Sequence, residues 1–350
     1  MYTQQITHIM NDSTRDPIWM WHPVNDTQYE CRVCPHACRL RPHQVGLCRV
    51  RWHDGNGIAP VPQQQLISAV PGAVERHNLY HFVPFQRTLL LGSVGCSASC
   101  SYCQNWEVAL APRHVPSWQA PQPTYQLSDI VHIARTQQVQ ALVCSISEFS
   151  VWPEMLHELS IAAKADGLSL ALISNGYVTP EWLLHTAPCF DAIKIDIKGG
   201  TPAQMRDVGL TWDPVVHAIR TLAAQQIWLE CSVVVPANPG GTEIVTAIGE
   251  FLVAEGLTHI PLHLQRMFPA YQQSRVAPTP VAELIAHRAQ LRKMGMQYVY
   301  ISNVKGLPEN NTYCVACGAI VVDRTHQHDV TGKCAACHAS VPGHWSYRSK

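Results

Sequence analysis

Three cysteines stand close together in the sequence, in the pattern Cys96-x3-Cys100-x2-Cys103. They follow a short apolar run, residues 88–91, which is closed by glycine and is typical of a buried strand that delivers a loop. Thiolates bind zinc, copper(I) or iron–sulfur clusters, and a [4Fe–4S] cluster normally takes four cysteines. Three cysteines would therefore leave one iron free to bind a substrate. A zinc knuckle lacking one ligand, or plain buried cysteines, fits less well because structural zinc takes four ligands and this loop follows a strand.

A second group of thiols lies in the N-terminal segment and consists of Cys31, Cys34, Cys38 and Cys48. Four cysteines suit one four-ligand site, which could hold zinc or a second iron–sulfur cluster, because both accept four thiolates. The spacing alone does not separate these two, and His36 could replace one of the cysteines. Residues 1–30 show no periodicity, so we expect them to form an irregular strap over the main domain.

A third group lies near the C-terminus and consists of two Cys-x2-Cys pairs, Cys314 with Cys317 and Cys334 with Cys337. This spacing predicts a zinc-ribbon or rubredoxin-like module. Zinc is favoured over iron because a structural ribbon folds on its metal and needs no redox partner. Only Arg324 and Lys333 supply nearby positive charge, so docking against the main domain or a protein partner is favoured over nucleic acid.

Composition fits a cysteine-rich metalloenzyme of a reducing compartment. The chain has 350 residues, 47% hydrophobic content and a formal net charge of +0, which allows a sizeable core and gives no reason to expect nucleic acid or an anionic membrane as partner. Its 14 cysteines gather mainly in the three groups rather than spreading as disulfide frameworks do. Residues 1–5 do not resemble the start of a signal peptide and no apolar run is long enough to span a bilayer, so we expect a cytoplasmic enzyme.

Between about residues 88 and 304, apolar runs alternate with helix-like segments, which predicts a parallel sheet covered by helices, either open or closed as a barrel. Threonine or aspartate followed by proline marks several helix starts, at Thr179, Thr201, Asp213 and Thr279. A helix with an apolar face formed by Val281, Leu284, Ile285 and Leu291 ends before Gly295. The candidate strands are 88–91, 141–145, 169–174, 192–197, 228–235, 260–264 and 298–301.

Polar residues lie in or just after these strands, where the carboxyl ends of a parallel sheet would gather them into a ligand site. Asp196 and Lys198 should share one side of an extended segment, because side chains alternate with a period of two. The candidates are Ser147, Glu148, Asn175, Asp196, Lys198, Glu230, His263 and Arg266.

The cysteine loop, with Tyr102 just before its last cysteine, resembles the cluster loop of the radical S-adenosylmethionine (radical SAM) superfamily. In that family the open iron chelates the amino and carboxylate groups of SAM, and an electron from the cluster cleaves a carbon–sulfur bond to give a 5′-deoxyadenosyl radical. The resemblance implies an α/β fold, a partial (β/α)6 TIM-like barrel with its chemistry at the carboxyl ends of the strands. It also implies a [4Fe–4S] cluster and SAM as cofactors, and an electron donor such as a flavodoxin or ferredoxin.

Several stretches resemble more specifically the radical SAM protein of the AmmeMemoRadiSam system, a relative of the pyruvate formate-lyase activating enzymes. They are residues 34–38, 103–106, 174–177, 196–198, 263–271 and 298–304. By this resemblance Ser147 and Glu148 would bind the SAM amino group, Asn175 its ribose or methionine part, and Asp196 with Lys198 its carboxylate end. Tyr102 and Gln104 would lie near the adenine, and Glu230, His263 and Arg266 complete the candidate cofactor-binding set.

We therefore expect three parts: an N-terminal cysteine-rich segment (1–84), a radical SAM partial barrel (85–308) and a C-terminal zinc-ribbon or rubredoxin-like module (309–350). The expected function is a radical SAM enzyme, an oxidoreductase or activating-enzyme-like protein, that abstracts hydrogen from an unidentified substrate. Its catalytic residues would be Cys96, Cys100 and Cys103. Two alternatives stay open: an activase for a glycyl-radical-type protein partner, and a non-enzymatic metal-stabilised scaffold that recruits partners through its cysteine sites.

Overall fold

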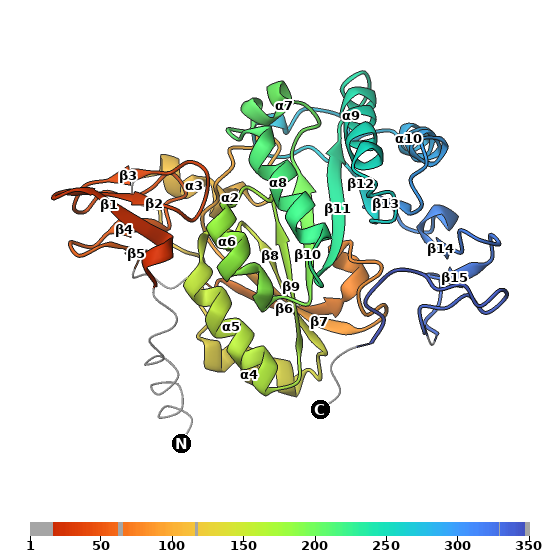
Figure 1. The fold of residues 1–350 in the computed structure, drawn as a ribbon, viewed down its shortest axis with the longest axis horizontal. Helices are drawn as coiled ribbons and strands as arrows, with labels where there is room; N and C mark the ends of the chain where they lie inside the picture. Colours follow the sequence, from red (N-terminus) through yellow and green to blue (C-terminus); the bar gives the residue numbers. More distant parts are fainter. Residues whose placement is uncertain (1–16, 62–65, 116–117, 329, 347–350) are drawn as a thin grey trace.

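An eight-stranded sheet occupies the centre of the computed structural model, which describes residues 17–61, 66–115, 118–328 and 330–346 (Figure 1). The strand order is β13-β12-β11-β10-β9-β8-β7-β6. Strands β7 to β13 run parallel to their neighbours, and only β6 is antiparallel, against β7. Within the described residues β6 and β13 do not pair with each other, so the sheet is an open, partial barrel as expected. The strands are β6 (Ser68–Ala73), β7 (Arg87–Gly92), β8 (Ala141–Ile146), β9 (Ser169–Ser174), β10 (Ala192–Ile197), β11 (Trp228–Val235), β12 (Leu262–Arg266) and β13 (Val299–Ser302).

Three central strands, β9, β10 and β11, have the predicted bounds, because their residues are almost continuously apolar and buried. Strand β12 begins two residues later than predicted. Pro261 precedes it and has no N–H to give to the ladder, although its carbonyl accepts a hydrogen bond from the backbone N–H of Cys231 at 2.8 Å. Strand β6 was not predicted, since Pro71 and Gly72 interrupt its sequence; it occupies the sheet edge, where such residues are tolerated.

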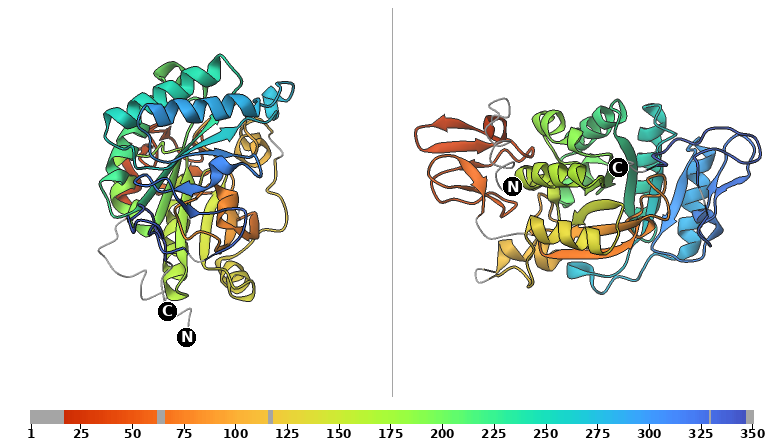
Figure 2. Two further views of the ribbon diagram at one scale, coloured as in Figure 1. Left: turned by 90° about the vertical axis from the view of Figure 1, so that its right-hand side faces the viewer. Right: turned by 90° about the horizontal axis from the view of Figure 1, so that it is seen from below.

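Helices cover the sheet between successive strands (Figures 1 and 2). They are α2 (Trp106–Ala109), α3 (Ala111–His114), α4 (Leu127–Thr136), α5 (Pro153–Ala165), α6 (Pro180–His185), α7 (Pro202–Asp207), α8 (Trp212–Ala223), α9 (Gly240–Ala254) and α10 (Val281–Lys293). None of the described helices is long and apolar enough to cross a membrane.

Two of the four predicted helix caps are correct. The hydroxyls of Thr179 and Thr201 accept the backbone N–H three residues on, at the starts of α6 and α7. Asp213 is not a cap, because α8 begins one residue earlier. Thr279 does not cap α10 either, since its hydroxyl donates to the carbonyl of Val235. In α10, Leu284 and Leu291 are buried as predicted, but Ile285 is 39% exposed.

The described part of residues 1–30, which we expected to be an irregular strap, instead contributes strands to a small module that also carries the N-terminal cysteines. Its elements are β1 (Trp21–Asn25), β2 (Gln28–Cys31), β3 (Arg39–Leu40), β4 (Arg51–His53) and β5 (Ile58–Pro60). Strands β1, β2 and β3 form one antiparallel sheet, and β4 pairs with β5. The prediction failed because such short strands show no usable periodicity. The first sixteen residues, including residues 1–5, lie outside the described part of the chain.

The C-terminal module contains β14 (Thr312–Tyr313) and β15 (Ile320–Val322) and lies at the other end of the molecule from the N-terminal module (Figures 1 and 2). It docks on the segment before β7: the backbone N–H of Val83 donates to the carbonyl of His344, and the N–H of His344 donates to the carbonyl of His81, each at 2.7 Å. Val322, Val341 and Tyr300 pack together in its hydrophobic contact with the barrel. The expected docking against the main domain is therefore present.

Gly95 lies where the N-terminal module meets the cysteine loop. Its φ is +79°, and a Cβ built there would lie 2.4 Å from the carbonyl oxygen of Cys48. We expect Gly95→Ala to lower the free energy of unfolding by about 3 kcal/mol or more, from left-handed strain plus the backbone clash. Gly256 is the matched control, because its φ is +70° but its Cβ would meet nothing within 4 Å. Equal denaturant midpoints for Gly95→Ala and Gly256→Ala would show that the close approach of Gly95 to Cys48 does not contribute to stability.

Candidate radical SAM site

A cavity of about 830 Å³ opens at the carboxyl ends of the parallel strands and collects most of the predicted site residues. Its volume suits a nucleotide-sized ligand. The predicted residues that line it are Cys96, Cys100, Tyr102, Cys103, Gln104, Ser147, Glu148, Asn175, Asp196, Lys198 and Arg266. They come from the loops after β7, β8, β9 and β10 and from the last residues of β10 and β12, in agreement with the position expected for parallel strands.

The cysteine loop is held from several sides. The backbone N–H of Cys103 donates to the carbonyl of Cys100 at 3.2 Å, and the N–H of Ala98 donates to the sulfur of Cys96 at 3.3 Å. Arg113 donates to the carbonyl of Cys96 and, at 2.7 Å, to the hydroxyl of Ser99. These contacts hold the loop in its observed direction.

Burial raises the pKa of all three thiols, Cys96 most strongly because the carboxylate of Glu148 adds to the effect. The ammonium group of Lys198 opposes this rise at Cys100 and Cys103. Buried thiols therefore hold their protons until a metal replaces them, as soft metal ligands do. Three convergent thiols on the wall of a cavity fit a [4Fe–4S] cluster with one iron left for another ligand.

Glu148 provides a buried carboxylate beside Cys96. It is 3% exposed, and its two oxygens accept the backbone N–H groups of Asn175 at 2.8 Å and Ser150 at 3.2 Å. Burial raises its pKa, although these hydrogen bonds oppose the rise. Among the described residues no basic side chain pairs with it. A cationic ligand in the cavity would therefore find a partner here.

Ser147 and Asn175 line the same wall of the cavity, but their polar side-chain atoms form hydrogen bonds with other residues of the protein. Ser147 adopts a φ of +70° and its hydroxyl donates to the carbonyl of Gly95. The amide nitrogen of Asn175 donates to the hydroxyl of Ser97 at 2.9 Å, and its oxygen accepts the N–H of Tyr177 at 2.9 Å. Both side chains therefore position the cysteine loop, and their predicted contact with SAM stays a prediction.

Asp196 and Lys198 lie on one side of β10 and its extension, as the period of two predicts. Asp196 lies 3.2 Å from the Lys194 ammonium and 3.6 Å from that of Lys198. Burial would raise the pKa of Asp196, but the two ammonium groups outweigh it and hold that pKa well below its usual range. The Asp196 carboxylate in turn raises the pKa of Lys198 against the effect of burial. Lys198 thus stays positive on the cavity wall.

Tyr102, Gln104 and Arg266 lie at the rim of the cavity. The Tyr102 hydroxyl donates to the carbonyl of Lys198 at 3.2 Å, and the Gln104 amide donates to the carbonyl of Phe268 at 3.0 Å. Arg266 stacks over the Phe268 ring at 5.1 Å. These contacts tie the cysteine loop to the loops after β10 and β12.

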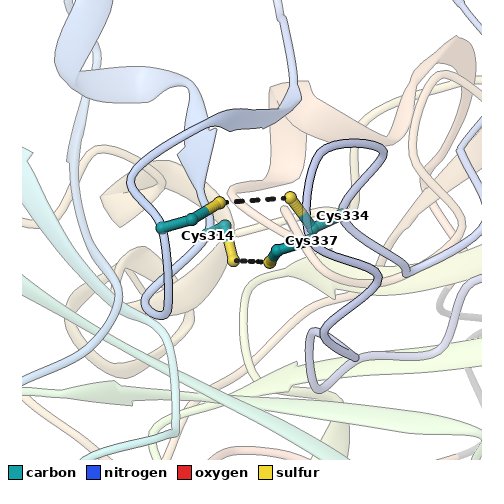
Figure 3. Close-up of side chains that lie close together, drawn as sticks. Cys314, Cys334 and Cys337 are labelled. Carbon is teal, nitrogen blue, oxygen red and sulfur yellow. Dashed lines mark hydrogen bonds between the residues drawn. The ribbon is translucent and has the colours of Figure 1, made fainter.

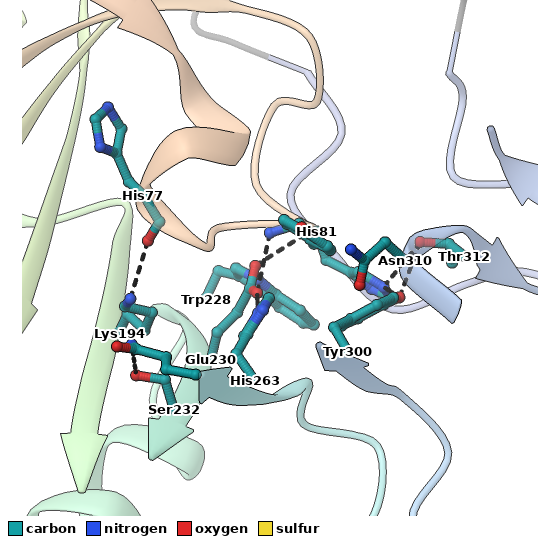
Figure 4. A network of polar contacts seen from close by, with 12 residues as sticks. His77, His81, Lys194, Trp228, Glu230, Ser232, His263, Tyr300, Asn310 and Thr312 are labelled. Atoms are coloured by element: carbon teal, nitrogen blue, oxygen red, sulfur yellow. Dashed lines mark hydrogen bonds and ion pairs between the residues drawn. The ribbon is translucent and has the colours of Figure 1, made fainter. Parts of the chain in front are cut away.

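The structure places Glu230 and His263 away from the cavity, in a buried network under the C-terminal module (Figure 4). The His263 ring donates to the Glu230 carboxylate at 2.6 Å, and the backbone N–H groups of Tyr80 and His81 donate to it at 3.0 and 2.9 Å. Burial would raise the pKa of Glu230, but its interactions with His263, His81 and the backbone N–H of Tyr80 together outweigh burial and lower that pKa to about 2. The two side chains hold each other and the segment that carries His81.

His81 links this network to the C-terminal module. Its Nδ1 donates to the carbonyl of Pro342 at 2.7 Å, and its Nε2 accepts from the hydroxyl of Tyr300 at 2.6 Å. Burial lowers the pKa of His81 from 6.5 to about 4. Since the unfolded chain binds the proton more readily, this neutral histidine stabilises the fold above pH 6.5, and the contribution disappears as the pH falls toward 4.

We predict that wild type loses up to about 3 kcal/mol more than His81→Gln when the pH is lowered from about 6.5 to about 4. The measurement is urea unfolding of both proteins across this range. His77, whose pKa burial also lowers to about 4, titrates in both proteins and cancels in the difference. Parallel curves for the two proteins would show that His81 does not carry the acid sensitivity.

The four C-terminal cysteines form a compact ligand set (Figure 3). Their sulfurs all lie within 4.8 Å of one another, and the pairs Cys314–Cys337 and Cys317–Cys334 are 3.6 Å apart. A tetrahedral ion about 2.3 Å from each sulfur would separate the sulfurs by about 3.8 Å. The predicted zinc-ribbon arrangement is thus present and fits a single ion.

The residues that escaped the sequence prediction include two charged residues of the cavity wall and one arginine beside the cysteine loop. Glu75 and Arg76 reach the cavity from the 3-10 turn Val74–His77, in a part of the chain that we assigned to the N-terminal segment. Arg113 supports Cys96 from α3. A basic residue one short helix beyond the cysteine loop was a usable signal for Arg113, whereas nothing in the sequence around Glu75 and Arg76 marks a site.

An open parallel sheet with a thiol-lined cavity at its carboxyl edge defines the class of protein: an α/β partial barrel whose candidate site lies at the carboxyl ends of its strands. Residues 90–244 match the family model of the radical SAM superfamily. The chain therefore carries a radical SAM domain, which includes the cysteine loop and β8 to β11.

Other similarities cover more of the chain. The "Uncharacterized protein MJ0808" of Methanocaldococcus jannaschii is 28% identical over 305 residues, which are 87% of this chain and 90% of that protein. SuiB of Streptococcus suis, bound to the precursor peptide SuiA, has a TM-score of 0.49 at 11% identity; the match covers 66% of this chain and 52%, about half, of SuiB. QueE from Escherichia coli has a TM-score of 0.41 at 11% identity, over 68% of this chain and 93% of QueE.

Proposed function

We propose that this protein is a radical SAM enzyme that acts through a [4Fe–4S] cluster held by Cys96, Cys100 and Cys103. When bound, the cluster and SAM would supply reductive cleavage of the sulfonium to a 5′-deoxyadenosyl radical, which takes a hydrogen atom from the substrate. The observation that carries the proposal is the placement of three thiols and one buried carboxylate on the wall of a single cavity; this carboxylate, Glu148, has no basic partner among the described residues.

Different residues of the cavity wall would bind different parts of SAM or hold the cysteine loop. Glu148 would accept a hydrogen bond from the SAM amino group. Two backbone N–H groups hold its carboxylate in place, and it lacks a cationic partner among the described side chains. Lys198, kept positive by Asp196, would meet the carboxylate end of SAM. Asn175 and Arg113 would keep the cysteine loop in place.

The substrate would enter at the rim of the cavity. We propose a flavodoxin or ferredoxin as electron donor, and we place the chain in the AmmeMemoRadiSam branch on the motifs described above. We propose zinc for Cys314, Cys317, Cys334 and Cys337, because their module packs as a structural ribbon and its sulfur spacing suits one ion.

Anaerobic reconstitution followed by dithionite and SAM tests the proposal. We expect 5′-deoxyadenosine by liquid chromatography and mass spectrometry from wild type, and none from protein treated with an iron chelator before the assay. Reconstituted protein that contains iron and sulfide but forms no 5′-deoxyadenosine, with or without cell extract as a source of substrate, would favour the non-enzymatic scaffold.

A further inference from the structure

We propose that Cys31, Cys34, Cys38 and Cys48 hold a second [4Fe–4S] cluster, and not zinc, next to the radical SAM site. The four cysteines line one small cavity in the N-terminal module, together with Arg51. Three of them are buried, and Cys38 is half-buried. This inference does not depend on SAM cleavage by the barrel.

The spacing of the sulfurs separates a cluster from a single ion. In the C-terminal set all four sulfurs lie within 4.8 Å of one another, with two pairs at 3.6 Å. Within the described ranges, no three sulfurs of the N-terminal set are that close to one another, and the same is true of Cys96, Cys100 and Cys103. Each cysteine of a [4Fe–4S] cube binds a different iron, so a cube holds its sulfurs farther apart than one ion does. The N-terminal set therefore behaves like the barrel's cluster loop and unlike the zinc ribbon.

The four N-terminal cysteines converge on one small space inside their module. The surroundings also suit a sulfur-rich anion, because backbone N–H groups stabilise negative charge on three of the sulfurs: Val33 at Cys31, His36 at Cys34, and both Val50 and Arg51 at Cys48.

Arg51 supplies a buried positive charge at this cavity. It is 1% exposed, and its guanidinium lies 2.7 Å from the carboxylate of Glu154 and 3.2 Å from the carbonyl of Ile58. Its Nε has no hydrogen-bond partner among the described residues. A buried N–H without a partner is costly, and a cluster sulfur would satisfy it. The positive charge of Arg51 also interacts with the sulfurs of Cys31 and Cys48.

The N-terminal site lies directly against the cysteine loop of the barrel. The carbonyl of Cys48 lies against Gly95, the residue before Cys96. The Nε2 of His36 donates to the carbonyl of Ser97 at 2.8 Å, so this nitrogen is not available as a replacement ligand. The two cysteine sets are therefore neighbours, joined by direct contacts between their loops.

Metal and sulfide analysis of two multiple variants tests the proposal on the full chain. We expect about eight irons per wild-type chain after anaerobic reconstitution, and about four in the triple variant Cys96→Ala/Cys100→Ala/Cys103→Ala, with Mössbauer parameters of a [4Fe–4S] cluster. Zinc should stay at about one per chain in both, from the C-terminal site. The proposal would be overturned if the triple variant bound no iron or only about two irons per chain. It would also be overturned if wild type contained about two zinc ions per chain.

The double variant Cys31→Ala/Cys48→Ala provides the complementary measurement. It should lose about four irons, and the electron paramagnetic resonance signal of its remaining reduced cluster should change when SAM is added. The signal of the triple variant should not respond to SAM. If the double variant fails to fold, the iron content of the triple variant still decides. A wild type that binds a second cluster but makes no 5′-deoxyadenosine would contradict the proposed function and leave this inference standing.

Discussion

Cys96→Ala is expected to abolish 5′-deoxyadenosine formation and to remove about four irons per chain, because only three cysteines hold the cluster at this site and two thiolates do not retain it. Cys96 also interacts with the carboxylate of Glu148. The amide of Asn175 lies 4.0 Å from its sulfur and donates to the hydroxyl of Ser97 in the same loop. The measurement is iron content and 5′-deoxyadenosine yield under dithionite. The yield should fall to that of protein without reconstituted cluster.

Cys144→Ala is the matched control. Cys144 is a fully buried cysteine on β8 that does not line the cavity, and burial alone raises the pKa of its thiol. This variant should unfold about 1 kcal/mol more easily because of its smaller core side chain, yet keep the wild-type iron content and yield. Wild-type iron content and 5′-deoxyadenosine yield in Cys96→Ala would show that the cluster is bound elsewhere in the chain.

Glu148→Gln is expected to weaken SAM binding about 10- to 100-fold with the iron content unchanged. The change keeps the shape of the side chain but removes the negative charge that would pair with the SAM amino group, a charge-assisted contact of about 1.5–3 kcal/mol. Equilibrium dialysis of reconstituted protein with labelled SAM gives the dissociation constant directly.

Glu158→Gln serves as its control. Glu158 lies on α5, does not line the cavity, and burial raises its pKa as it does that of Glu148. Unchanged SAM affinity in Glu158→Gln combined with a loss in Glu148→Gln would assign the effect to the cavity. Wild-type affinity in Glu148→Gln would leave the SAM amino group without the partner proposed here.

The sequence was sufficient where local pattern decides structure. Strands β9 to β11 were predicted residue by residue because buried parallel strands are almost continuously apolar. Asp196 and Lys198 were placed together because a strand alternates its side chains. The three cysteine groups were visible from spacing alone, and the C-terminal group assembles as predicted.

Depth along a strand was not predictable in the same way. Glu230 stands two residues before Ser232, the residue that pairs with Asp196 in register, and two residues advance a strand by about 7 Å. Glu230 thus lies deeper in the sheet than the cavity wall, where the segment at Tyr80 and His81 covers it. The period of two gives a residue's face but not its distance from the mouth, and the covering segment comes from 150 residues away in the chain.

The central claim is that the cluster at Cys96, Cys100 and Cys103 leaves one iron for the amino and carboxylate groups of SAM. Electron–nuclear double resonance on the reduced triple-cysteine site, in the Cys31→Ala/Cys48→Ala background with SAM labelled with ¹⁵N at its amino group, tests this most directly. We predict a hyperfine coupling between the cluster and the labelled nitrogen. A cluster signal that is unchanged by SAM and shows no nitrogen coupling would contradict the account.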